Sequence, residues 1–172
     1  MAAASHLVSR FVGSLRPGGP GRAAEAWVAS QLLEGEHALW RRMSGPDRRH
    51  AHRVARDVER ALGHEASRPV LAAALLHDVG KLDAGLGTYG RVIATLSGAV
   101  AGRDMAHLWV TRTGFTRRVG LYLLHPSIGG DMLELAGSDP LTVAWAREHH
   151  LPPEEWTVPA PVATVLKTCD NN

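Results

Sequence analysis

Glycine and proline residues divide the chain into segments of helical length, and the positions of these helix breakers limit the fold more than any other feature. Pro69, Pro126 and Pro140 stand where a proline suits the first turn of a helix, while Gly63 and Gly137 stand where glycine ends one. No segment alternates apolar and polar residues over the length that a sheet strand needs. Alanine, leucine, valine and arginine are abundant and aromatic residues make up only 5%, a composition that favours helices. The sequence therefore predicts an all-α fold.

The apolar periodicity between these breakers predicts where the helices lie. Ser44 can cap a helix that Gly63 ends, and residues 83–90 are a glycine-rich loop. The predicted helices span about residues 23–43 with a break at Gly35, 48–62, 69–79, 91–101, a stretch after 116, 126–136 and 140–150, with a last helix from 161.

The length of 172 residues suits one compact domain. Residues 1–22 are set apart as an N-terminal amphipathic segment, with apolar side chains such as Leu7 and Phe11, followed by a linker rich in proline and glycine. We expect this segment to pack against the domain, which spans residues 23–172.

Composition and charge argue against several classes of protein. The single cysteine, Cys169, allows no intrachain disulfide and favours a reducing, cytoplasmic location. Arg10 and Arg16 interrupt the N-terminal apolar stretch, which argues against a secretory signal, and no apolar run is long enough to predict a membrane span. The formal net charge of +2 is small and the basic residues are scattered, so nucleic acid is not an expected partner.

The ten histidines indicate the chemistry, because several of them lie at predicted helix ends together with aspartates. Neutral imidazole and carboxylate suit Fe, Mn, Zn or Co, and a shared carboxylate can hold two such ions close together. The adjacent His77 and Asp78 would point about a quarter-turn apart on a helix, so other helices must complete the ligand shell. The candidate metal ligands are His50, His77, Asp78, His125, His149, His150 and Asp170.

The motifs between about residues 40 and 170 resemble those of the HD superfamily of metal-dependent phosphohydrolases. They are the run from His77 to Lys81, which reads His-Asp-Val-Gly-Lys, together with His50 in a His-x-x-x-Val-Ala setting and Asp170 downstream. In addition, His125-Pro126-x-x-Gly129 and the pair His149-His150 look like the second-metal ligands of the HD-GYP branch.

The resemblance implies a compact HD-domain helical bundle with two metal sites. One ion would be held by His50, His77, Asp78 and Asp170. Asp78 would bridge to a second ion, held by His125, His149 and His150. Asp78 and Lys81 would be the catalytic residues, with Lys81 in contact with the substrate phosphate.

The chain departs from the HD-GYP pattern at three places, one of which is a longer insertion between Asp78 and His125 that carries the predicted helix near Arg91. After His150 it reads Leu-Pro-Pro-Glu-Glu-Trp in place of the Asp-Gly-x-Gly-Tyr-Pro signature, and Pro46 stands where a glutamate would hold a third metal. The site is therefore expected to be dinuclear and not trinuclear, and cyclic di-guanylate is not the expected substrate.

The expected activity is hydrolysis of a small phosphomonoester or phosphodiester, with nucleotides among the candidates. Two divalent transition-metal ions, Fe or Mn before Zn, Co or Ni, would lie about 3.5–4 Å apart and activate a bridging hydroxide that attacks phosphorus. Lys81 would offer its positive charge to a non-bridging phosphate oxygen. The alternatives are a di-iron oxygenase on an HD-type scaffold and a non-catalytic regulator that binds a nucleotide.

For several residues the sequence is also consistent with a second role. His52 stands two positions after His50 and could exchange roles with it. Asp83, or a water molecule, could replace Asp170 as the fourth ligand, because Asp170 stands in the last predicted helical turn, where helices fray. Lys81 could instead cap a helix, and His150 could be a donor to the substrate.

Overall fold

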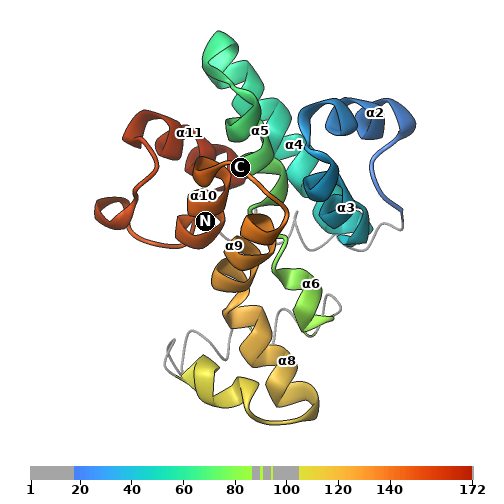
Figure 1. The fold of residues 1–172 in the computed structure, drawn as a ribbon, viewed down its shortest axis with the longest axis vertical. Helices are drawn as coiled ribbons and strands as arrows, with labels where there is room; N and C mark the ends of the chain where they lie inside the picture. Colours follow the sequence, from blue (N-terminus) through green and yellow to red (C-terminus); the bar gives the residue numbers. More distant parts are fainter. Residues whose placement is uncertain (1–17, 87–89, 91–93, 95–104, 172) are drawn as a thin grey trace, which may run out of the picture.

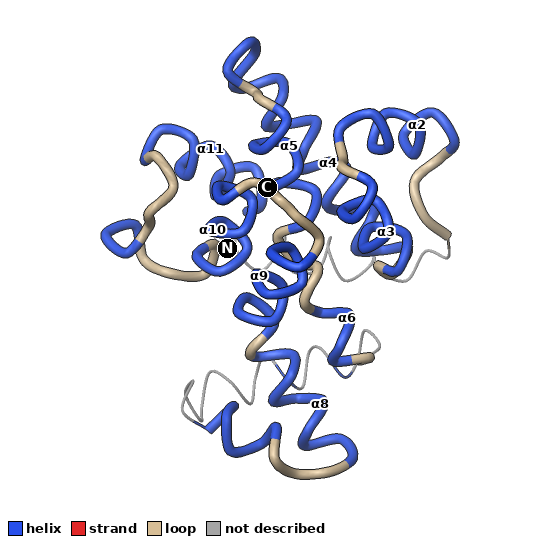
Figure 2. The backbone as a smooth tube through the Cα atoms, viewed as in Figure 1, coloured by secondary structure: helices blue, strands red, loops and turns tan. Residues whose placement is uncertain are grey.

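The computed structural model describes residues 18–86, 90, 94 and 105–171, and the regular elements in this part of the chain are all helical (Figures 1 and 2). The all-α prediction is confirmed. The helices are α2 (Arg22–Gln31), α3 (Glu34–Arg42), α4 (Gly45–Leu62), α5 (Arg68–Leu76), α6 (Lys81–Ala84), α8 (Gly114–Leu123), α9 (His125–Leu135), α10 (Pro140–Glu148) and α11 (Ala160–Asn171), with short 3-10 turns η1 (Gly63–Glu65) and η2 (Pro153–Glu155). Across these described ranges, no helix is long and apolar enough to cross a membrane.

Two predicted segments lie outside the described residues. They are most of the amphipathic segment with its linker, residues 1–17, and the predicted helix 91–101, of which only Ala94 is described. The first described helix, α2, begins at Arg22, one residue before the predicted start of the domain.

Helix α5 lies at the centre of the fold (Figure 1). Every residue from Val70 to Leu76 is buried, and the helix contacts α2, α3, α4, α10 and α11. A helix that is apolar on all sides is stable only when it is covered on all sides. The turn that follows it, which carries His77 and Asp78, is therefore held at the middle of the molecule.

Helix α4 begins and ends where the sequence predicts. The Ser44 hydroxyl accepts a hydrogen bond from the backbone N–H of Asp47 at 3.3 Å, Pro46 lies in the first turn, and Gly63 ends the helix with φ of 55°. Its buried side chains fall at helical spacing and face the core; they are Ala51, Val54, Ala55 and Val58.

The break within the predicted helix 23–43 was placed wrongly. The helix stops at Leu32 and Leu33, because the Glu36 carboxylate accepts a hydrogen bond from the backbone N–H of Leu33 at 2.8 Å and so starts α3. Gly35 lies inside the first turn of α3. A side chain there would come within 2.6 Å of the Ala136 carbonyl oxygen, so this glycine serves a close approach and not a break.

The two helices expected to carry the histidine motifs are shorter than predicted. Helix α5 stops at Leu76 instead of residue 79, and α10 stops at Glu148 instead of residue 150. The pairs His77-Asp78 and His149-His150 therefore lie in turns directly after a helix. His77 and His149 still have right-handed helical backbone angles, so each pair continues the direction of its helix into the turn.

Helices α6 and α8 extend the molecule below the main body, and α9 connects α8 to it (Figure 1). Their small apolar core includes Ala84, Leu86, Val119 and Leu121. The expected loop 83–90 begins later than predicted, because Asp83 belongs to α6 and the chain leaves that helix at Gly85, with φ of 55°.

Candidate metal centre

All seven predicted ligands lie together, although they come from five different elements. Asp78 belongs to two groups whose ligand atoms lie within 4.8 Å of one another. One group consists of Asp78, His125, His149 and His150, and the other of His50, His77 and Asp78. Asp170 adjoins the second group, 2.9 Å from His50 and 3.4 Å from His77.

Three of the imidazoles are held in the same way by the backbone. In His77, His125 and His149, Nδ1 lies 2.9, 2.7 and 2.9 Å from the carbonyl oxygen of the residue three positions earlier. A carbonyl oxygen can only accept, so each Nδ1 carries a proton, and in the neutral form of the ring each Nε2 keeps a lone pair. This arrangement is the usual one for histidines that bind a metal through Nε2.

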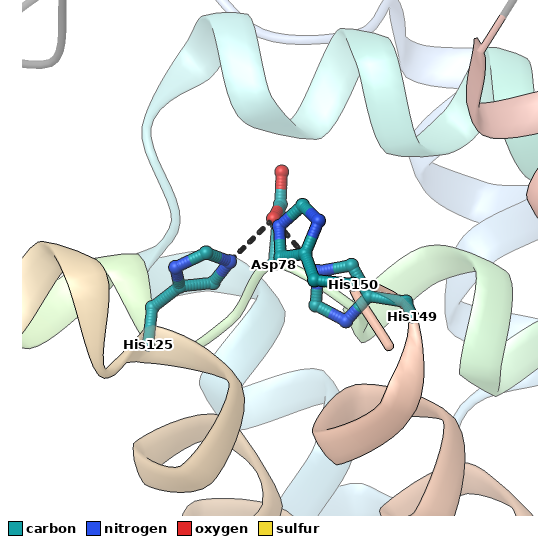
Figure 3. A group of neighbouring side chains, drawn as sticks. All are labelled: Asp78, His125, His149 and His150. Atoms are coloured by element: carbon teal, nitrogen blue, oxygen red, sulfur yellow. Dashed lines mark ion pairs between the residues drawn. The ribbon is translucent and has the colours of Figure 1, made fainter. Parts of the chain in front are cut away.

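The Nε2 atoms of these three histidines converge on the Asp78 carboxylate. His125 and His149 lie 3.3 and 3.7 Å from Oδ1 of Asp78, and His77 lies 3.5 Å from Oδ2. Figure 3 shows His125 on one side of the carboxylate and His149 with His150 on the other. The three Nε2 atoms are buried and form no hydrogen bond to any described residue. Burying a polar atom without a hydrogen bond lowers the stability of the fold. A cation placed among the three Nε2 atoms would accept the lone pair of each neutral ring.

His50 is oriented differently from the other three. Its Nδ1 lies 3.2 Å from the guanidinium of Arg53, which can only donate, so the proton is on Nε2. This Nε2 donates to Oδ1 of Asp170 at 2.9 Å. His50 and Asp170 thus hold each other at the edge of the cluster, on helices α4 and α11.

At two positions the sequence left two candidate ligands open, and the structure distinguishes between them. The ring of His52 packs edge-on against Trp27, with centroids 5.5 Å apart, whereas His50 faces the cluster. Asp83 is exposed on α6, whereas Asp170 is buried on α11. His50 and Asp170 are therefore the residues that the fold brings to the site.

Asp78 is ionised in this environment. Burial alone would raise its pKa, but the adjacent Lys81 ammonium and the His77 imidazole hold the pKa well below its ordinary value. Lys81 forms an ion pair with Oδ2 of Asp78, and its own pKa is raised because the attraction of Asp78 outweighs the effect of burial. A buried carboxylate that remains charged is the group that can share two cations.

The histidines divide into two electrostatic classes. Burial would lower the pKa of His77, but the carboxylates of Asp78 and Asp170 raise it to about 9. Burial lowers the pKa of His125 and lowers that of His149 to about 4. His150 is more exposed, and its pKa is lowered by partial desolvation and by the neighbouring histidines. His125, His149 and His150 are therefore neutral at ordinary pH, which is the form that binds a metal.

A cavity of about 280 Å³ lies beside Asp78 and Lys81. Arg42 and Ser44, at the junction of α3 and α4, line its polar side with Asp47, while Met43, Leu82 and Leu86 give it an apolar wall. The sequence analysis did not single out Arg42, Ser44 or Asp47 as site residues. The available signal was their position at the start of the helix that carries His50: Arg42 and Ser44 precede this helix, and Asp47 lies in its first turn.

Glu148 stands directly before the histidine pair, but it is not among the site residues predicted from the sequence. It is buried, and its carboxylate accepts hydrogen bonds from the backbone N–H of Thr157 at 2.8 Å and the Thr157 hydroxyl at 2.5 Å. These bonds fold the chain after His150 back onto the end of α10. Glu148 therefore fixes the turn that presents His149 and His150.

Comparison with known proteins gives no independent assignment of the cluster. No family model, curated protein or solved structure matches the chain. The interpretation of the cluster therefore depends on the arrangement of its side chains.

Proposed function

We propose that the protein is a metal-dependent phosphohydrolase of the HD superfamily, which its motifs resemble, with two divalent transition-metal ions at the centre described above. The observation that carries the proposal is the convergence of three buried imidazole Nε2 atoms, without hydrogen bonds among the described residues, on one charged carboxylate. Nitrogen and carboxylate ligands of this kind suit Fe or Mn, with Zn, Co and Ni as alternatives.

The two oxygens of Asp78 support two ions in preference to one. Oδ1 faces His125 and His149, while Oδ2 faces His77. A carboxylate placed with one oxygen toward each ligand group can bridge two cations. The first ion would be held by Asp78, His77 and Asp170 together with His50, whose ring would have to carry its proton on Nδ1 so that Nε2 could bind. The second would be held by Asp78 with His125, His149 and His150.

The remaining residues suit a phosphate ester as substrate. Bound ions would supply an activated water and positive charge for the phosphoryl group. Lys81 borders both the cluster and the cavity, so its ammonium can contact a non-bridging phosphate oxygen. Arg42 adds a second positive charge on the cavity wall, and the apolar residues opposite can pack against the leaving group. Asp47 and Ser44 can bind hydroxyl or amino groups of that leaving group.

An activity screen on the metal-loaded protein tests this proposal. The full chain, stripped with a chelator and reloaded with Mn²⁺ or Fe²⁺, would be assayed with p-nitrophenyl phosphate, bis(p-nitrophenyl) phosphate and a panel of nucleotides. We expect metal-dependent release of phosphate or nitrophenol, lost in Asp78→Asn. Turnover with Mn²⁺ alone would exclude the di-iron oxygenase alternative. A protein that holds two ions and hydrolyses no phosphate ester in the panel would contradict the proposal.

A further inference from the structure

Lys167 connects α11 to the turn that carries two of the candidate ligands. Its ammonium donates a hydrogen bond to the backbone carbonyl oxygen of His149 at 2.5 Å. His149 directly follows the last residue of α10, where helix carbonyls lack partners within the helix. Lys167 thus binds the backbone of a candidate ligand.

Helix α11 reaches both groups of ligands from one face. Lys167 and Asp170 are three residues apart and so lie on the same side of the helix. Asp170 contacts His50 and His77 in the first group, and Lys167 contacts His149 in the second. Any shift of α11 against α10 would therefore move ligands of both groups.

We propose that Lys167 is a positioning residue for the second metal subsite, and that through α11 it ties the geometry of this subsite to that of the first. The proposal rests on the two-ion centre proposed above. Glu148, the residue before His149, binds Thr157 through its carboxylate, while Lys167 binds the carbonyl oxygen of His149 itself. Without Lys167, the turn would keep its link to Thr157 and lose its link to α11.

A simple helix-capping role makes a different prediction from a positioning role. A capping residue contributes to folding stability, and its loss lowers the unfolding midpoint without selecting one metal ion. A positioning residue changes the affinity of the ion whose ligand it orients; the loss of such outer contacts costs about 10–100-fold in metal affinity. The two roles therefore separate in a metal titration.

The test is a Co²⁺ titration of the wild type and Lys167→Met, followed by equilibrium dialysis and by visible absorption. We expect the dissociation constant of the second ion to rise about 10–100-fold in Lys167→Met, while that of the first stays within about threefold. Lys167→Arg should restore the second ion, because its guanidinium can reach the same carbonyl. If Lys167→Met does not fold, Lys167→Gln provides the same comparison.

Arg68→Met is the matched control. Arg68 also donates to the carbonyl oxygen of a residue at a helix end, Gln31 of α2, at 3.0 Å, but it lies away from the cluster. We expect this variant to bind both ions like the wild type. If the wild type binds two ions and Lys167→Met binds both with unchanged affinity, the positioning role is wrong while the proposed centre stands. If the wild type binds fewer than two, the two-ion centre itself fails, and the inference with it.

Discussion

Asp78 is the residue on which the two ligand groups depend. It is 5% exposed, and its oxygens face three imidazoles and the Lys81 ammonium. Lys81 in turn has few other partners in the described structure: its ammonium lies 5.7 Å from the ring of Tyr122 and borders the cavity. In the proposed function, Asp78 would therefore bind metal while Lys81 would contact the substrate.

Replacing Lys81 by methionine should separate these two roles. The change removes the ammonium but keeps the length of the side chain, so we expect both metal ions to remain and kcat to fall about 10²–10³-fold, as when one charge-stabilising donor is lost. Metal analysis and steady-state kinetics on the same sample measure both effects. Arg60→Met is a suitable control, because Arg60 is exposed and pairs only locally with Asp57. Wild-type turnover in Lys81→Met would show that Lys81 is a structural partner of Asp78 alone.

Metal binding should release a proton from His77. Its pKa is raised to about 9, so it is protonated in the metal-free protein at pH 7.5 and must lose that proton to bind an ion. His149, with a pKa lowered to about 4, is already neutral and releases none. We expect about one proton per chain on loading, and metal affinity that increases with pH up to about 9.

Calorimetric titration in two buffers of different ionisation enthalpy measures this proton directly. The heat of binding should differ between the buffers by about one ionisation enthalpy. Equal heats in both buffers at pH 7.5 would mean that His77 is not a ligand, or that it is already neutral.

The gathering of the candidate ligands in one cluster could be predicted from the sequence, but the residues that support this cluster could not. Many of the candidate ligands stand in short local motifs, so their spacing can be read directly from the sequence. One motif contains His77, Asp78 and Lys81, and another is the pair His149-His150. Lys167 is 18 residues from His149 in the sequence, and its contact exists only because the packing of α11 on α4 and α5 brings α11 to the turn after α10. Arg42 joins the site because the cavity happens to lie against the end of α3.

Helix α9 packs directly on the turn that carries the His77-Asp78 pair. A side chain at Gly80 would come within 2.0 Å of the His125 carbonyl oxygen and 2.6 Å of the Gly129 backbone nitrogen. Gly80 has φ of −63°, so the need for glycine here is one of space and not of backbone conformation. This close approach brings His125, the first residue of α9, within reach of Asp78.

Gly80→Ala should therefore displace α9. We expect a loss of about 1–3 kcal/mol in the free energy of unfolding, as for other overpacked sites, together with weaker binding of the second ion because His125 moves. Urea unfolding and metal titration measure the two effects. Gly21→Ala is the control, since no atom lies within 4 Å of the added carbon, and it should cost less than about 1 kcal/mol. Unchanged binding of both ions in Gly80→Ala would contradict this account of how α9 is placed.

Helix α11 brings Asp170 to the first subsite. Asp170→Asn keeps the shape but removes the charge, so we expect the first ion to be lost or weakened at least about 100-fold. Asp83→Asn removes a carboxylate of the same kind from the exposed surface of α6 and should leave both ions bound. Dialysis against Mn²⁺ with metal analysis distinguishes them. The reverse pattern, with loss in Asp83→Asn alone, would make Asp83 the ligand.

Helix boundaries could be predicted where a local cap determines them, and not where a distant contact does. Ser44 and Gly63 fix the ends of α4, and both signals are local. The early ends of α5 and α10 have no comparable signal in the sequence, since His77 and His149 are acceptable helical residues. In both turns the imidazole binds the carbonyl oxygen three residues back, a side-chain bond that periodicity does not reveal.

At the scale of the whole molecule, the buried helix α5 explains why ligands from distant parts of the sequence meet. It is covered by α2, α3, α4, α10 and α11, so the turn after Leu76 is surrounded by the ends of its neighbours. The positions of glycine and proline, together with the apolar periodicity between them, predicted the all-α class. They could not predict which helices would surround α5, because that depends on how the apolar faces fit together.

The central claim is that one cluster of histidines and aspartates holds two divalent ions bridged by Asp78. Metal analysis of the full chain after dialysis against excess Mn²⁺ tests it most directly, with Asp78→Asn as the paired sample. We expect about two ions per chain in the wild type, because two ligand groups share one carboxylate, and fewer than about one in the variant. At most one ion in the wild type would remove His125, His149 and His150 from the centre, and two ions retained in Asp78→Asn would contradict the bridging role.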